Sequence, residues 1–217
     1  MTLFVFHASY PTDTVRELLE KGVSAKVKIN GYNSLHIACK KNHIRIVQEI
    51  LSHYGEKIVD VRTDDGRTPM HISCFEGNFA IVKVLQNFSV TYGVDVDRSG
   101  NTALHMAAWG GHKCIVEYLV ESLDISPRVK NYECMEPVHF AAAGNHCDIF
   151  EYFISLVSPG EEFESPTTSG LGSLHRAAMV GSIRIMKFIL ERGLCAQNAL
   201  AANGSTCLHF ACQGGKV

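Results

Sequence analysis

The 217-residue sequence lacks long apolar runs, since no stretch approaches the ~18 apolar residues that a membrane-spanning helix needs. Residues 1–7 have no basic region and too short an apolar run for a secretory signal peptide. An excess of one charge is also missing, because 20 Lys and Arg stand against 22 Asp and Glu. A near-neutral chain is not a general polycation. We therefore expect no nucleic-acid partner and no membrane insertion.

Motifs that carry catalysis or bind cofactors are missing as well. The sequence has no HExxH, no CxxC and no glycine-rich nucleotide loop. Residues 214–216, Gly-Gly-Lys, lack the upstream glycine and the following Ser or Thr of a phosphate-binding loop. We predict a protein that is not an enzyme, with no catalytic, cofactor-binding or metal-binding residues. The alternative is a metal or catalytic cluster among its 11 His and 8 Cys.

Six of the histidines recur at near-constant intervals of 35, 34, 34, 36 and 34 residues. Each histidine directly follows an apolar residue. After the histidine come one more residue, apolar in most copies, and then two small residues. The six are His36, His71, His105, His139, His175 and His209. Self-similarity with this period predicts a solenoid of stacked supersecondary units.

The second copy, residues 64–85, shows how one unit is built. Gly66 supplies the positive φ of a tight turn, and Thr68 is a helix N-cap followed by Pro69 in the first turn. Gly77 ends this helix, and an apolar stripe from residue 79 onward predicts a second one. The pattern is that of a turn followed by two antiparallel helices.

This unit resembles the ankyrin repeat, which has a period of about 33 residues and a T-P-L-H-x-A signature. The third copy, residues 100–119, matches equally well, and the resemblance covers essentially the whole chain. It implies an all-α solenoid of helix-turn-helix units with β-turn or hairpin tips. The expected helix pairs are 33–41 and 43–53, 68–76 and 79–88, 102–110 and 112–122, 136–144 and 146–157, and 172–180 and 182–192.

We expect one continuous array rather than two domains. Its predicted units are a partial one at 1–29, repeats at 30–62, 63–96, 97–130, 131–166 and 167–200, and a partial one at 201–217. A solenoid normally ends in a polar capping repeat, but this sequence stops within a unit. We interpret it as a fragment of a longer protein; a natural end with a truncated cap is the alternative.

The repeat also accounts for nine of the eleven histidines. The resemblance implies that the six signature histidines hydrogen-bond the turn and adjoining backbone. His43, His112 and His146 open second helices. Equivalent positions in successive repeats lie about 10 Å apart, so the histidines at these positions cannot bind one metal ion together.

The cysteines fill repeat slots too. Cys39, Cys74 and Cys212 stand where sister repeats have alanine, so they are expected to be reduced, small and buried. Reduced cysteines favour a cytoplasmic location, with the nucleus as the alternative.

Repeats four and five depart from the pattern. Glu136 and Gly172 replace the capping threonine, and Cys134 replaces the turn glycine. We expect these to be the least stable interior units. Residues 158–169 form an acidic insertion that we interpret as a mobile loop, either functional or simply tolerated.

In the family, the concave surface comprises the turn tips and the exposed positions of the first helices. Transferring those slots predicts the partner-binding residues Tyr32, Arg67, Phe75, Glu76, Arg98, Trp109, Tyr132, Glu133, Met135 and Met179. We expect Phe75, Trp109 and Tyr132 to form an apolar centre inside a charged rim, since aromatic and arginine side chains dominate binding hot spots. The alternative is that Trp109 packs on the neighbouring unit and Met179 completes local packing.

Charge along the chain indicates what the partner carries. Residues 117–170 have 2 Lys and Arg against 10 Asp and Glu, whereas residues 171–217 have 5 against 1. We therefore expect a protein or peptide partner with a basic segment facing residues 117–170. The predicted function is a non-enzymatic protein–protein interaction module. The alternative is the regulatory or targeting segment of a larger kinase, channel or acyltransferase.

Overall fold

The computed structural model describes residues 12–88, 94–158, 162–165 and 167–215, and helices alternate with turns throughout. These residues contain no strand beyond an isolated bridge between Ile29 and Tyr32. The helices are α1 (Thr12–Glu20), α2 (Ser34–Lys40), α3 (Ile44–Tyr54), α4 (Pro69–Glu76), α5 (Phe79–Gln86), α6 (Ala103–Gly110), α7 (Lys113–Glu117), α8 (Pro137–Ala143), α9 (Cys147–Ser155), α10 (Ser173–Val180), α11 (Ile183–Glu191) and α12 (Cys207–Gly214).

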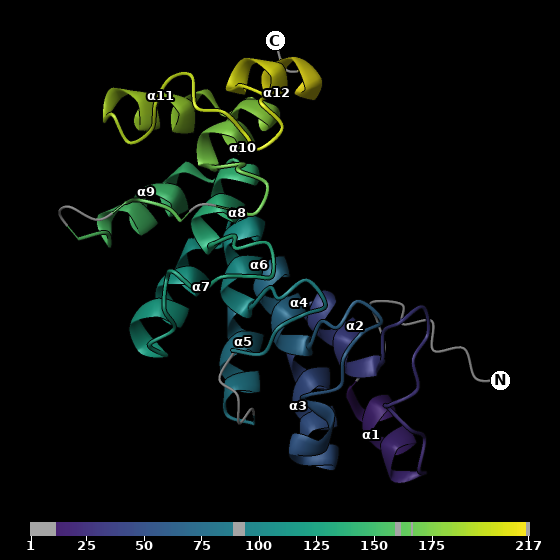
Figure 1. Ribbon diagram of the computed structural model, residues 1–217. Coiled ribbons are helices and arrows are strands. Elements are labelled where there is room, and N and C mark those ends of the chain that lie inside the picture. The colour runs from purple at the N-terminus through teal and green to yellow at the C-terminus, as the bar shows by residue number, and fades with distance from the viewer. Residues whose placement is uncertain (1–11, 89–93, 159–161, 166, 216–217) are drawn as a thin grey trace.

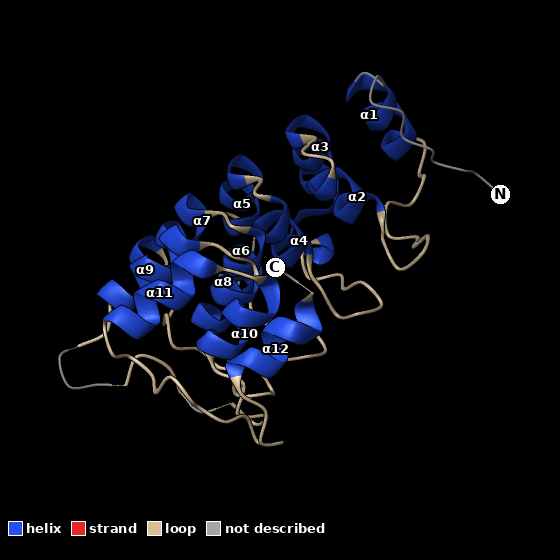
Figure 2. Cartoon of the chain, turned by 90° about the horizontal axis from the view of Figure 1, so that it is seen from above, coloured by secondary structure: helices blue, strands red, loops and turns tan. Residues whose placement is uncertain are grey.

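Two rows of helices make up the molecule (Figure 1). The first helices of successive units, α2, α4, α6, α8, α10 and α12, stack on one another in chain order. The second helices, from α1 to α11, form a parallel row beside them, and Figure 2 shows this row fanning along one side of the stack. The all-α solenoid expected from the repeat is confirmed.

The helix bounds agree with the expected pairs to within about two residues for the first helices, with small differences in the second helices. In unit three the second helix consists of the short α-helix α7, which continues directly into a π-helical segment, η2 (Tyr118–Ser122). A short 3₁₀ turn, η1 (Gly55–Ile58), follows α3. Both irregular segments lie at the ends of second helices, away from the first-helix stack.

Small side chains allow the first helices to stack closely. Ala107 and Ala108 in α6, like Ala141 and Ala142 in α8, are fully buried. In the same slots Cys39 and Cys74 are also fully buried, as predicted.

The prediction is wrong for Cys212, which is exposed, because α12 is the last helix that the structure describes and no described unit packs over it. All eight cysteines lie within the described ranges and are free thiols.

Three of the signature histidines, His71, His105 and His175, join their helix to the backbone of the following unit through Nε2. The Thr68 backbone N–H donates to Nδ1 of His71 (3.2 Å), and Nε2 of His71 donates to the Asn101 carbonyl (2.9 Å). His105 makes the same pair of bonds one unit later, its Nε2 reaching the Met135 carbonyl at 3.0 Å. Burial lowers the pKa of His105 to about 4, so the ring is neutral at pH 7.

The hairpin tips are joined to one another by backbone hydrogen bonds. The Arg98 N–H donates to the Asp65 carbonyl at 3.1 Å. The same bond recurs from Tyr132 to Ser99 (3.1 Å), from Thr168 to Glu133 (3.1 Å) and from Ala202 to Ser169 (3.0 Å). This ladder holds the tips of units two to six in a continuous edge.

The departures in repeats four and five are compensated locally. Glu136 caps α8 in the reciprocal manner of the threonines, with His139 as its partner. Gly172 has no side chain, and the Ser173 N–H is instead bound by both carboxylate oxygens of Glu164, at 3.1 and 2.9 Å. Of the insertion expected to be a mobile loop, residues 159–161 and 166 lie outside the described residues, whereas residues 162–165 are docked against the next unit, where Glu164 caps α10.

Candidate partner-binding groove

A groove of about 620 Å³ lies along the hairpin tips and first helices of units two to four. Hairpin-tip residues form most of its wall, and two aromatic residues of the first helices complete it. Its lining residues are Asp64, Asp65, Arg67, Asp97, Arg98, Ser99, Asn101, Trp109, Asn131, Glu133, Met135 and Phe140.

Aromatic rings form the apolar part of the groove. Trp109 on α6 lies between Phe75 of α4 and Phe140 of α8, with edge-to-face ring centroids 5.4 and 6.1 Å apart. The neighbours therefore hold the indole, as the packing alternative required, yet 42% of Trp109 stays exposed. His146 fixes the end of α6 by donating from Nε2 to the Trp109 carbonyl at 3.0 Å.

Charged side chains at the hairpin tips form the rim. Nε of Arg67 lies 3.0 Å from Asp65 and 3.9 Å from Asp97. Burial alone would raise the pKa of Asp65, but the Thr63 hydroxyl and the Arg67 charge hold it below its ordinary value. Four carboxylates and two guanidinium groups line the groove, so its net charge is negative. Basic groups on a partner would be attracted to this rim.

The groove brings together five of the ten predicted binding residues: Arg67, Arg98, Trp109, Glu133 and Met135. Two more predicted residues lie beside it. Phe75 stacks on Trp109, and Tyr132 is a hairpin-tip residue, 69% exposed, whose ring covers Gly100.

The three other predicted residues do not line this groove. Tyr32 lines a separate hollow of about 250 Å³, where the Lys40 ammonium lies 5.5 Å from its ring. Glu76 is exposed at the end of α4. Met179, 39% exposed, belongs to α10, one unit beyond the groove. A partner that contacts the groove would reach Tyr32 or Met179 only through additional surface.

Several lining residues were not predicted. Asp97 and Asn131 open their hairpins, and their side-chain oxygens accept N–H bonds from Asn101 (2.9 Å) and Met135 (2.9 Å). Asp97 and Asn131 occupy the same position of the repeat as Thr63 and Thr167. This recurrence of a hydrogen-bonding side chain is the sequence signal that could have identified them. Phe140 was overlooked because the residue after the signature histidine is usually buried, as Ile72 and Met106 are.

The described part of the chain offers neither a metal site nor a membrane span. No group of three or more His, Cys, Asp or Glu side chains among these residues could hold a metal ion. Likewise, none of the helices described combines the length and apolar content needed to cross a bilayer.

Several curated proteins are similar in sequence to this chain over most of its length. Mouse B-cell lymphoma 3 protein homolog is 29% identical over 198 residues, which is 87% of this chain and 42% of the relative. The chicken nuclear factor NF-kappa-B p105 subunit is 25% identical over 92% of this chain and 21% of its own length. Human transient receptor potential cation channel subfamily A member 1 is 29% identical over 88% and 17%. The chain thus spans less than half of each of these relatives.

Family models agree with the structural repeat. The model described as ankyrin repeats (3 copies) matches residues 1–62, 56–131 and 136–217, and the model described as ankyrin repeats (many copies) matches residues 114–154. These matches cover nearly the whole sequence and coincide with the stacked helix pairs. The chain therefore belongs to the ankyrin-repeat family, whose repeats generally mediate protein–protein interactions.

Proposed function

We propose that this array is a non-enzymatic scaffold that binds a partner protein or peptide in the groove of units two to four. The observation that carries the proposal is Trp109, which is 42% exposed although it packs on two other aromatic rings, Phe140 in the groove and Phe75 beside it. A large aromatic side chain that is already positioned loses little entropy on binding, and tryptophan is enriched among hot-spot residues.

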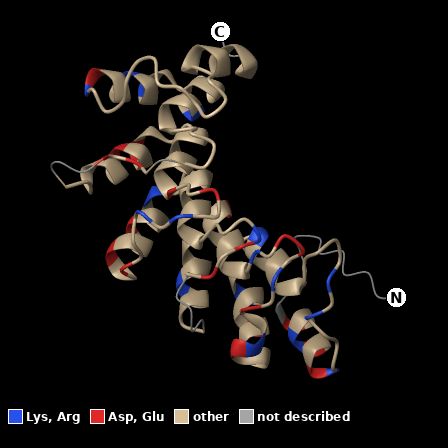
Figure 3. Cartoon of the chain, viewed as in Figure 1, with Lys and Arg blue, Asp and Glu red and all other residues tan. Residues whose placement is uncertain are grey.

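The proposed partner places an apolar side chain on Trp109 and a basic segment over residues 117–170. Supporting this, that segment has 2 Lys and Arg against 10 Asp and Glu. Figure 3 shows acidic positions along α9 and at the end of the α7–η2 helix. A basic segment would accelerate association through long-range attraction and would make binding sensitive to salt.

The second candidate is a regulatory or targeting segment of a longer protein. A relative named as a cation channel matches this chain over only 17% of the channel's length, which favours that possibility. Kinase, channel or acyltransferase activity would then lie outside these residues. The free cysteines support a cytoplasmic or nuclear location for either candidate.

Replacing Trp109 with alanine tests the groove. The array serves as bait, and captured proteins from wild-type and Trp109→Ala baits are compared by quantitative mass spectrometry. For an identified partner we expect the variant to bind at least ~30-fold more weakly, equivalent to about 2 kcal/mol. Because Trp109 also packs on Phe75, circular dichroism must first show that the variant is folded.

Lys187→Ala is the matched control, since Lys187 is an exposed residue of the second helix α11. It should leave the affinity unchanged. If Lys187→Ala abolishes binding while folded Trp109→Ala does not, the partner uses the second-helix face and the groove proposal fails.

A further inference from the structure

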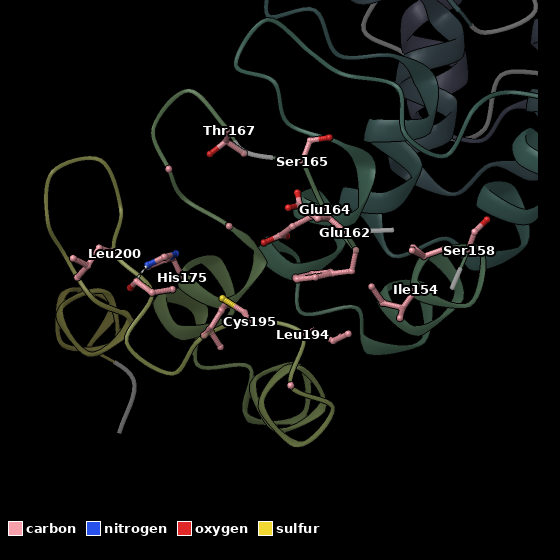
Figure 4. Close-up of a pocket in the computed structure, with 17 residues that line it drawn as sticks. Ile154, Ser158, Glu162, Glu164, Ser165, Thr167, His175, Leu194, Cys195 and Leu200 are labelled. Carbon is pink, nitrogen blue, oxygen red and sulfur yellow. Dashed lines mark hydrogen bonds between the residues drawn. The ribbon is translucent and has the colours of Figure 1, made fainter. Parts of the chain in front are cut away.

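A second cleft, of about 730 Å³, lies between units four and five (Figure 4). Its walls come from the end of α9, the docked residues 162–165, the start of α10 and the connection 193–200. In Figure 4 Glu162 and Glu164 lie on one side, and Leu194, Cys195 and Leu200 lie across from them. This volume is in the range typical of small-molecule sites.

The chemistry of the walls is apolar with acidic groups at one edge. Phe163, Leu194 and Leu200 are among the apolar side chains, and Glu162 and Glu164 supply carboxylates. No lysine or arginine is among the lining residues that the structure describes. An occupant should therefore combine an apolar stem with a positive charge.

The preceding junction of the array shows which group suits this place. Arg128 and Glu164 occupy the same repeat slot, each eleven residues before a signature histidine. The Arg128 guanidinium donates to the Glu162 carbonyl at 3.0 Å and lies 3.4 Å from the Glu136 carboxylate. At the junction between units four and five, the slot holds a carboxylate instead. The cation that the array itself supplies at one junction is replaced by an acid at the next.

We infer that the cleft between units four and five binds an arginine from the basic segment of a partner peptide. The guanidinium meets the carboxylates of Glu162 and Glu164, and the apolar parts of the peptide contact Leu194 and Leu200, which lie towards opposite ends of the cleft. Arginine fits better than lysine because its planar fork can pair with carboxylates in two-point fashion. The inference rests on the proposed function and identifies where the partner's basic part is received.

The surroundings of Glu164 are consistent with an incoming cation. Its carboxylate lies 3.3 Å from Nε2 of His139, accepts the Ser173 N–H, and is near the charges of Glu136 and Arg176. Burial lowers the pKa of His139 to about 3, so that ring is neutral and does not compete as a cation. Arg176 on α10 attracts Glu164 but does not line the cleft. A carboxylate has about four acceptor sites, so bonds to Ser173 leave capacity for a guanidinium.

Binding should depend on pH because of the same carboxyl group. Burial raises the pKa of Glu164 to about 7, so a large part of the group is protonated at pH 6. A guanidinium binds the ionised form preferentially. The affinity for an arginine peptide should therefore rise between pH 6 and pH 8.

The test uses the full chain with methyl-labelled leucines and the N-acetylated, C-amidated peptide Gly-Leu-Arg-Leu-Gly. We expect saturable NMR shifts of the Leu194 and Leu200 methyls at pH 8. Leu208, 74% exposed on α12, is the internal control and should not shift. A peptide with citrulline in place of arginine keeps the shape but loses the charge, and should bind at least tenfold more weakly. Equal binding of the two peptides, or equal shifts at Leu208, would overturn the inference.

A matched pair of variants separates this cleft from the groove. Glu162→Gln should weaken the arginine peptide at least fivefold, whereas Trp109→Ala should leave its affinity unchanged. If Glu162→Gln has no effect on the peptide, the cleft assignment is wrong, whatever the groove does. If the peptide result holds but Trp109→Ala does not weaken the partner, the groove proposal fails and the cleft stands.

Discussion

At the scale of single residues, Cys134 is the hairpin-tip position, among the described residues, where the repeat departs from glycine while keeping its geometry. The equivalent residues Gly66 and Gly100 have φ values of +84° and +80°, and Cys134 has a φ of +56°. A side chain in this left-handed region is crowded by the carbonyl oxygen, at a cost of roughly 1–2 kcal/mol. The hairpin of unit four therefore keeps its shape at a local cost in stability.

Cys134→Gly should raise the free energy of unfolding by about 0.5–1 kcal/mol. The gain is smaller than the full relief of strain because glycine also increases the entropy of the unfolded chain. Urea denaturation followed by circular dichroism measures it. Cys114→Gly, at an exposed position in α7, is the control and should destabilise the array by about 1 kcal/mol. An unchanged or lower stability for Cys134→Gly would show that Cys134 makes compensating contacts.

At the scale of elements, the start of α10 depends on a side chain from outside its own cap. In α4 and α6 the cap is the residue directly before the helix, Thr68 or Thr102. For α10 that residue is Gly172, and a Cβ built on it would lie 2.3 Å from Oε1 of Glu164. A threonine at 172 would therefore require the Glu164 carboxylate to move from its present position.

A double-mutant cycle tests this exchange. Glu164→Ala should lower the free energy of unfolding by about 1 kcal/mol through loss of the cap. Gly172→Thr alone should also lower it, because the new side chain displaces Glu164. The double variant restores the arrangement of α4, so its loss should be smaller than the sum of the two single losses. Additive losses, measured by chemical denaturation, would refute the substitution of one cap by the other.

Sequence reasoning succeeded where the signals are adjacent and failed where they are not. The bounds of α4 could be predicted because Thr68, Pro69 and Gly77 are local start and stop signals. Glu164 as a cap could not be predicted, since it acts eight residues before the position it replaces, across a segment that reads as an acidic loop. The same holds for the groove. Trp109 follows from its slot, whereas Phe140 enters the lining only because it contacts the indole from the next unit.

At the scale of the whole molecule, buried neutral histidines couple stability to pH. Burial lowers the pKa of His36 and His105 to about 4 and that of His139 to about 3, and it also lowers the pKa of His71. Unfolded histidine titrates near 6.5, so their stabilising contribution is present above pH 6.5 and lost as the pH falls towards 4. Glu164 opposes this trend, because its raised pKa contributes stability at low pH that is lost between about 4.5 and 7.

The histidines outnumber the single carboxyl group, so acidification should destabilise the array. We expect the free energy of unfolding to fall by about 3 kcal/mol from pH 7 to pH 5. Urea titrations at the two values provide the measurement. Glu164→Gln removes the opposing contribution and should make the loss steeper. A stability that stays flat over this range would mean that the buried rings gain protons without cost.

The backbone ladder between hairpin tips determines where this chain can change its length. Each tip is bonded to the next, as Asp65 is to Arg98 and Ser99 is to Tyr132, so an added residue in a tip would shift every later rung out of step. The described residues of the connections that follow the second helices carry no such rungs. The 36-residue interval between His139 and His175 shows that one of these connections already holds extra residues. Insertions, tags and grafted segments are thus confined to the second-helix side, and the edge that bears the groove keeps a constant pitch.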